Sequence, residues 1–235
     1  MLPIKDDQPR YSTPYINNFL IGLNLVIFFF EATLTPASLK TLLHQFAVVP
    51  AHVTAFLQGS PRYSLPAVVI PFFTSMFLHG SWMHVLGNMW FLYIFGDNVE
   101  DYLGHFKYLV FYLLAGLFAM TVQAAADPHS TVPTLGASGA IAGVLGAYFV
   151  LYPKGRVLTW FPPIFFFHLP AWIMLGYWFV VQFLGGAATA LVYEGRAKDG
   201  GGGIAFWAHV AGFLGGIVMI KIFPERQRRY PYAYR

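Results

Sequence analysis

The sequence predicts an all-α integral membrane protein, built as a bundle of six transmembrane helices. Composition is the first reason: 57% of the residues are apolar and only 10% are charged, whereas a soluble domain carries about 25% charged residues. The second reason is that six mostly apolar segments approach the ~20 residues needed to cross a bilayer. The 235 residues suffice for one such bundle, so we expect a single domain over residues 1–235.

Clear breaks separate the predicted spans. Charged residues, prolines or glycines mark the breaks at 97–104, 127–133, 153–156 and 194–203. Residues 161–167 are apolar but contain two prolines, so this segment is interpreted as the approach to the fifth span. In chain order, the predicted spans cover residues 17–33, 81–96, 106–126, 136–152, 169–191 and 204–223.

The connection between the first two spans, residues 36–80, is much longer than the others. It is apolar in patches and is interrupted by Pro50, Pro61, Pro66 and Pro71. One interpretation is an irregular loop on the outer side of the membrane. The alternative is that residues 39–49 form an amphipathic helix lying in the membrane interface.

The distribution of Lys and Arg predicts the orientation, because cytoplasmic segments of membrane proteins are enriched in these residues. With the N-terminus inside, the outer segments hold only Lys40, Arg62, Arg196 and Lys198. We therefore expect both termini in the cytoplasm. Separately from the charges, we expect the membrane to be a bacterial inner (plasma) membrane. We expect no removable signal peptide, since charged residues precede the first apolar run. The inner segments hold Lys5, Arg10, Lys107, Lys154, Arg156, Lys221, Arg226, Arg228, Arg229 and Arg235.

Four polar residues lie inside predicted spans, where polar groups are costly and often functional. They are His84 and Asn88 in the second span, Ser138 at the start of the fourth, and His209 in the sixth. A rise of ~1.5 Å per residue places all four roughly 18 to 24 Å above the cytoplasmic ends of their helices. Three separate spans thus bring a polar group to one layer, displaced toward the outer face.

The fourth span is unusually short after Ser138. The helix from there to residue 152 is only about 22 Å long, against a hydrocarbon core of ~30 Å. Its N-terminus should therefore end inside the membrane, at the floor of a recessed, wet pocket that residues 131–136 enter. A helix N-terminus offers unpaired N–H groups and positive potential, which suit a developing oxyanion.

Small residues recur at four-residue spacing in two of the spans. Gly139 and Gly143 lie in the fourth span, and Ala208, Gly212 and Gly216 lie in the sixth. Such faces allow helix backbones to approach closely. If the two faces pack together, Ser138 and His209 become neighbours.

Each polar residue alone has a simpler interpretation. Ser138 could be a small packing residue, His209 an interhelical hydrogen-bond donor and Asn88 a polar contact between helices. His79 and His84 could lie near the interface without a role. Metalloprotease chemistry is not indicated, because the chain has no cysteine and no HExxH motif. An aspartyl dyad is not indicated either, and we expect no metal or cofactor. The carboxylates considered for such a dyad lie at span edges: Asp97, Glu100, Asp101, Asp127, Glu194 and Asp199.

Three motifs, in order along the chain, resemble those of the rhomboid family of intramembrane serine proteases. Residues 79–88, His-Gly-Ser-Trp-Met-His-Val-Leu-Gly-Asn, resemble the motif of that family's second span. Residues 136–139, Gly-Ala-Ser-Gly, resemble its nucleophile motif, and residues 208–212, Ala-His-Val-Ala-Gly, resemble the motif of its last span. Glu100 also fits, and the similarity covers roughly residues 67 to 222.

The resemblance implies a six-helix fold of rhomboid type and a role for each polar residue. Ser138 would be the nucleophile and His209 its base, without a third carboxylate. Asn88, His84 and the Ser138 backbone N–H would form the oxyanion hole. Two positions depart from relatives: Ile70-Pro71 stands where well-studied bacterial members have Trp-Arg, and Ala142 stands where some members stack a Tyr against the catalytic His.

The sequence thus predicts a serine endopeptidase that cleaves transmembrane segments of other membrane proteins near the outer face. The expected partners are transmembrane protein substrates and the lipid bilayer, with no nucleic acid. One alternative is a rhomboid-like protein that binds membrane clients without cutting them, although Ser138 and His209 are both present. A small transporter is the other alternative, but paired broken helices in matching halves are not evident.

Overall fold

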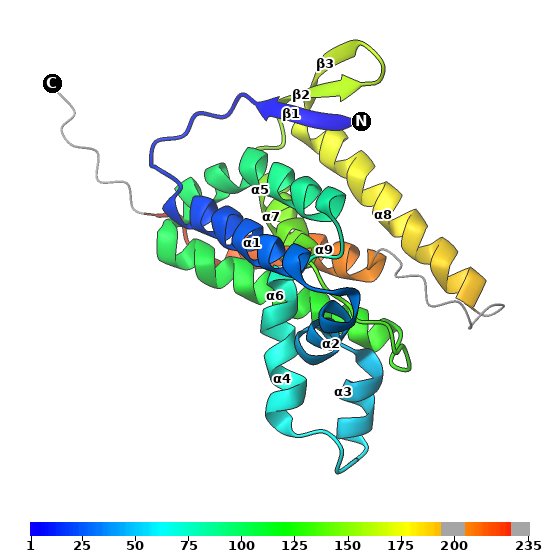
Figure 1. Cartoon of the computed structure of the whole chain (residues 1–235). Helices are drawn as coiled ribbons and strands as arrows, with labels where there is room; N and C mark the ends of the chain where they lie inside the picture. The colour runs from blue at the N-terminus through cyan, green and yellow to red at the C-terminus, as the bar shows by residue number, and fades with distance from the viewer. Residues whose placement is uncertain (194–204, 227–235) are drawn as a thin grey trace, which may run out of the picture.

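The computed structural model describes residues 1–193 and 205–226 of the chain, and these form a mostly helical protein (Figure 1). The predicted connection 194–203 lies outside the described residues. Long helices occupy all six regions predicted as spans: α1 (Tyr15–Thr33), α5 (Trp82–Leu103), α6 (His105–Ala126), α7 (Ser138–Leu151), α8 (Ala171–Tyr193) and α9 (Phe206–Ile222).

Length and composition qualify three helices in the described part of the chain as candidate membrane spans. They are Tyr15–Thr33, His105–Ala126 and Ala171–Ala188. The pair Leu65–Phe77 and Trp82–Leu103, bent by 76° at the break between them, counts as a fourth if it forms one span. Ser138–Leu151 and Phe206–Ile222 are apolar but shorter. The short α7 agrees with the length expected from the sequence.

Helix α5 continues to Leu103, through residues 97–103 that were predicted to break the second span. The helix thus extends past the predicted end of the second span, and acidic residues of its last turns bond to the start of α1 and to the segment before it. The Glu100 carboxylate accepts the backbone N–H groups of Ile16 and Asn17 at 3.0 and 2.7 Å, and so caps the N-terminus of α1. The Asp101 carboxylate accepts the Ser12 hydroxyl at 2.5 Å.

A three-stranded antiparallel sheet is the departure from an all-α fold. Strands β1 (Leu2–Asp6), β2 (Arg156–Phe161) and β3 (Phe165–Pro170) pair in that order. The segment interpreted as the approach to the fifth span is therefore the tip of the β2–β3 hairpin, where Trp160 lies opposite Phe166. The Asp6 carboxylate, which ends β1, accepts the Tyr148 hydroxyl at 2.5 Å, and burial raises its pKa to about 6.

Residues 36–80 are helical rather than irregular. Helices α2 (Pro36–Phe46), α3 (Pro50–Leu57) and α4 (Leu65–Thr74) are followed by the 3₁₀ helix η1 (Ser75–Phe77). Prolines at 36, 50 and 66 occupy the first turns of these helices, where no N–H is needed. Helix α2 begins and ends three residues before the predicted 39–49, and α2–α4 lie together at the end of the molecule opposite the sheet (Figure 1).

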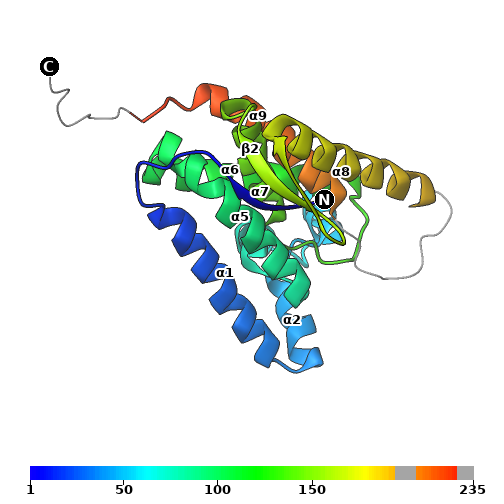
Figure 2. The ribbon, with the colours of Figure 1, turned by 90° about the horizontal axis from the view of Figure 1, so that it is seen from above.

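Helix α7 lies at the centre of the bundle. Viewed from above, α1 and α8 are on opposite sides, with α7 between them (Figure 2). Every residue of α7 from Gly139 to Tyr148 is buried. The core around it includes Phe95, Phe111 and Tyr112 from α5 and α6. The first residue of this central helix is Ser138.

Candidate active site

Ser138 begins α7 directly after a sharp turn in the chain. Gly136 has φ +122°, a conformation that residues with a side chain rarely adopt. Its N–H donates to the Ser75 carbonyl at 2.8 Å, and Thr134 pairs with Val48 by a two-bond bridge. These bonds hold the irregular segment 131–136 against η1 and against Val48, which precedes α3. Ser138 is thereby placed at the N-terminus of α7. The first N–H groups of a helix have no partner within it.

Helices α7 and α9 meet main chain against main chain. A methyl group added at Gly212 would collide with the Gly139 carbonyl oxygen, and one added at Gly216 would collide with that of Gly143. A methyl group added at Gly146 would collide with the Phe213 carbonyl oxygen. The predicted contact between the small-residue faces is therefore confirmed.

This contact brings Ser138 and His209 together. His209 Nε2 lies 2.8 Å from Ser138 Oγ, within hydrogen-bonding distance, and both side chains are partly buried. The α9 main chain beside it is also held, because the Ala208 N–H donates to Gln123 Oε1 of α6 at 3.1 Å. An imidazole nitrogen this close to a hydroxyl can take its proton while the oxygen attacks an electrophile.

The opposite edge of the His209 ring contacts α8. His209 Nδ1 lies 2.7 Å from Gln182 Oε1, and the Trp178 ring lies 5.9 Å from the imidazole at an interplanar angle of 36°. Neither residue was predicted to belong to the site. A signal for Gln182 was present, since it is an amide within a span that is otherwise free of amide and charged side chains from 171 to 188. Polar groups in such positions usually face the protein interior.

His84 and Asn88 lie one turn apart on α5, on the same face of that helix. A methyl group added at Gly136 would lie 2.8 Å from His84 Nε2 and 3.5 Å from Ser138 Oγ, so both side chains border the turn before α7. Asn88 is 9% exposed, and its Nδ2 lies 3.0 Å from His79 Nε2. The structure thus places His84 and Ser138 at the same turn and links Asn88 to the buried His79.

The contacts of Asn88 continue through His79 to a carboxylate, Glu31, which the sequence analysis did not consider among the acidic residues near the spans. Glu31 of α1 is 2% exposed, and it accepts the His79 backbone N–H at 3.1 Å. His79, regarded from the sequence as a residue without a role, is also 2% exposed. The start of α5 is therefore tied to α1 by a polar contact that no spacing in the sequence reveals.

The structure shows where the two positions that depart from the family motifs lie. Pro71 is buried inside α4 while Ile70 is 48% exposed. Ala142 is fully buried, and a methyl group added at Gly212 would lie 3.1 Å from its Cβ, so Ala142 faces α9. The aromatic ring beside His209 comes instead from Trp178 of α8.

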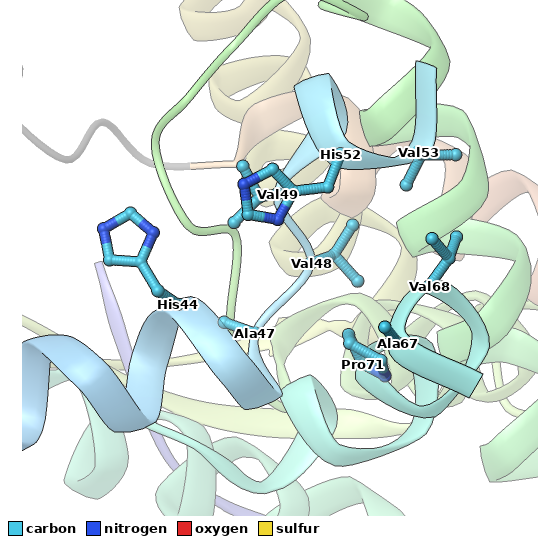
Figure 3. Close-up of a pocket in the computed structure, with 9 residues that line it drawn as sticks. All are labelled: His44, Ala47, Val48, Val49, His52, Val53, Ala67, Val68 and Pro71. Carbon is cyan, nitrogen blue, oxygen red and sulfur yellow. The ribbon is translucent and has the colours of Figure 1, made fainter. Parts of the chain in front are cut away.

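A separate hollow lies between α2, α3 and α4, lined by His44, His52 and Val68 among others (Figure 3). Burial lowers the pKa of His52, and the neighbouring His44 and Arg62 lower it further. None of the residues that line this hollow is Ser138 or His209. It is therefore distinct from the site of the Ser138–His209 pair.

Comparison with known proteins gives the family. The model of the Rhomboid domain matches residues 66–226, which include Ser138, His209, His84 and Asn88. The chain belongs to the rhomboid family. It is accordingly an integral membrane protein, and members of this family are generally intramembrane serine proteases.

Curated relatives of this rhomboid protein carry mitochondrial and chloroplast names. Rhomboid protein 1, mitochondrial, from Saccharomyces cerevisiae is 32% identical over 170 residues, which cover 68% of this chain and 45% of the yeast protein. The human Presenilin-associated rhomboid-like protein, mitochondrial, is 36% identical over 101 residues, or 41% of this chain and 26% of that protein. Rhomboid-like protein 11, chloroplastic, from Arabidopsis thaliana is 41% identical over 73 residues, or 31% and 26%. The chain therefore covers less than half the length of these relatives.

Proposed function

We propose that this rhomboid protein is a serine endopeptidase that cleaves transmembrane segments of other membrane proteins near the outer face. The observation that carries the proposal is the 2.8 Å contact between His209 Nε2 and Ser138 Oγ at the start of a short central helix. A serine hydroxyl is a weak nucleophile unless an adjacent base takes its proton.

The proposed reaction uses the dyad twice. Ser138 Oγ attacks the peptide carbonyl while His209 Nε2 accepts the hydroxyl proton, and His209 then returns this proton to the departing amine. Water hydrolyses the resulting ester of Ser138, with His209 acting again as base. The Ser138 N–H, Asn88 and His84 are assigned to the oxyanion that develops on the carbonyl oxygen.

The same proposal includes the membrane arrangement. It comprises six spans in one unit over residues 1–235, with α7 and α9 as short spans within the bundle and both termini in the cytoplasm. The positions of Lys and Arg support this orientation. A bacterial plasma membrane stays a prediction, because the matching relatives carry mitochondrial and chloroplast names.

The test is cleavage of a purified transmembrane substrate in proteoliposomes. The wild-type chain should cut it, and Ser138→Ala should abolish cleavage without lowering the thermal midpoint, because the change removes one small hydroxyl. Ser38→Ala, at an exposed position on α2, is the matched control and should cut at the wild-type rate. Cleavage by Ser138→Ala would overturn the assignment, and a folded wild-type chain that cuts no such substrate would favour the client-binding alternative.

A further inference from the structure

Gln182 is the polar contact of His209 on the side away from Ser138. Its Oε1 lies 2.7 Å from His209 Nδ1, while His209 Nε2 lies 2.8 Å from Ser138 Oγ. The imidazole is thus held at both nitrogens by partners from two different helices, α8 and α7. Neither the family motifs nor the proposed dyad assigns a role to the partner from α8.

The chemistry of this contact decides which nitrogen of His209 carries the proton. A neutral imidazole has one N–H, and its other nitrogen is an acceptor. An amide oxygen can only accept, so a hydrogen bond between Oε1 and Nδ1 requires the proton on Nδ1. The Nε2 lone pair is then free to take the Ser138 proton. The opposite amide orientation would place an NH₂ group against Nδ1 and leave Nε2 protonated, which would remove the base.

The surroundings of Gln182 show that α8 turns this residue inward. Val180 and Val181 are 50% and 42% exposed, and Phe183 and Leu184 are 45% and 60% exposed. Gln182 is partly buried, and Trp178, four residues earlier, lies against the same imidazole. Residues four apart share one face of a helix. One face of α8 therefore supplies both an acceptor for the His209 ring edge and an aromatic ring near its face.

We infer that Gln182 is the positioning residue of His209, an amide that holds the Nδ1–H tautomer as a carboxylate does in Ser-His-Asp proteases. This inference rests on the proposed function for its effect on cleavage. An amide performs the task without a charge, and a charged side chain within a membrane helix is costly. Gln182 touches neither substrate nor the Ser138 oxygen in this role, since it acts through His209.

Two substitutions of similar length separate positioning from packing. Gln182→Met keeps the length of the side chain and removes the amide, whereas Gln182→Glu keeps an acceptor oxygen at the same place. Loss of the hydrogen-bond partner that orients a metal-binding histidine typically costs about 10–100-fold in activity, and we expect the same range for the partner that orients His209. We therefore expect Gln182→Met to lower kcat by about 10–100-fold with KM unchanged. Gln182→Glu should retain more activity than Gln182→Met, and Gln58→Met, at an exposed position directly after α3, should leave both constants unchanged.

The decisive readout is the tautomer, because it does not depend on proteolysis. Nitrogen NMR of the ¹⁵N-histidine-labelled full chain, with His209 assigned from the signal lost in His209→Ala, reports which ring nitrogen is protonated. The wild-type chain should show the proton on Nδ1, and Gln182→Met should show a mixture of tautomers at an unchanged thermal midpoint. An Nε2–H tautomer in the wild-type chain, or an unaltered tautomer and kcat in Gln182→Met, would overturn the inference. If no variant cuts any substrate, the proposed function fails, while the tautomer still decides the role of Gln182.

Discussion

Two kinds of contact meet at the Ser138–His209 pair, and they differ in what they control. Helices α7 and α9 touch through their main chains, because a methyl group added at Gly212 or Gly216 would collide with the carbonyl oxygen of Gly139 or Gly143. Helices α5 and α8 reach the same place only through side chains. Main-chain packing therefore sets the distance between Ser138 and His209. The side chains of the outer helices set hydrogen bonding around that pair.

The difference extends to the burial of whole helices. Helix α7 is buried along most of its length, whereas α8 exposes large apolar residues, among them Tyr177, Val180 and Leu184. A Cβ at Gly176 of α8 would meet no atom within 4 Å. Substitutions at the α7–α9 contact should thus damage structure and activity together. Substitutions of the α5 and α8 side chains around Ser138 and His209 should alter activity with less effect on the fold.

The largest effect is expected from Gly216→Ala. The added methyl group would collide with the Gly143 carbonyl oxygen, which cannot move without its helix. Overpacking of this kind typically costs about 1–3 kcal/mol, so the thermal midpoint should fall and cleavage should be lost as the helices separate. Both are measured on the purified chain, by thermal unfolding in detergent and by the proteoliposome assay.

The matched control is the same substitution on α8. Gly176→Ala adds its methyl group to open space and replaces glycine by a residue about 1 kcal/mol more favourable in helices. It should retain cleavage and leave the thermal midpoint equal or higher. If Gly216→Ala proved as stable and active as Gly176→Ala, the α7–α9 contact would not be the feature that fixes the dyad.

A smaller effect, confined to rate, is expected at Asn88. Removal of one oxyanion donor typically costs about 10²–10³-fold in kcat, so Asn88→Ala should lose at least about 10²-fold. His84→Ala should lose less, since the remaining donors persist. His79→Ala is the informative comparison, because it removes the partner of Asn88 and leaves the amide in place. If the only role of Asn88 is to bind His79, Asn88→Ala and His79→Ala should both cut at nearly the wild-type rate. Only their stability should then differ from that of the wild-type protein.

The helices and the central pair could be predicted from the sequence because their signals are local and periodic. Apolar length places α1 and α6, and the four-residue spacing of Gly139 and Gly143 predicts a face that packs closely. The sheet could not be predicted in this way, since β1 pairs with residues about 150 positions later. The partners of the acidic residues near the end of α5 could not be predicted either, since Glu100 and Asp101 bond to residues 83 and 89 positions earlier.

The residues that support the site depend on helix rotation, which composition does not report. Gln182, His79 and Glu31 matter through contacts with residues distant in the chain, at 27, 9 and 48 positions. From the sequence alone, each of these three side chains could equally have formed a hydrogen bond with a nearby backbone group. The reacting groups are therefore more readily predicted than the groups that orient them.

Activation of Ser138 by His209 is the central feature of the proposed site. A fluorophosphonate probe tests it directly, because such probes bond covalently to activated serines and the site can be found by mass spectrometry of the intact, membrane-embedded chain. We expect an adduct on Ser138 in the wild-type protein, and none at this position in His209→Ala of equal thermal stability. An adduct on Ser138 formed equally fast in His209→Ala, or no adduct on Ser138 in the folded wild-type protein, would contradict it.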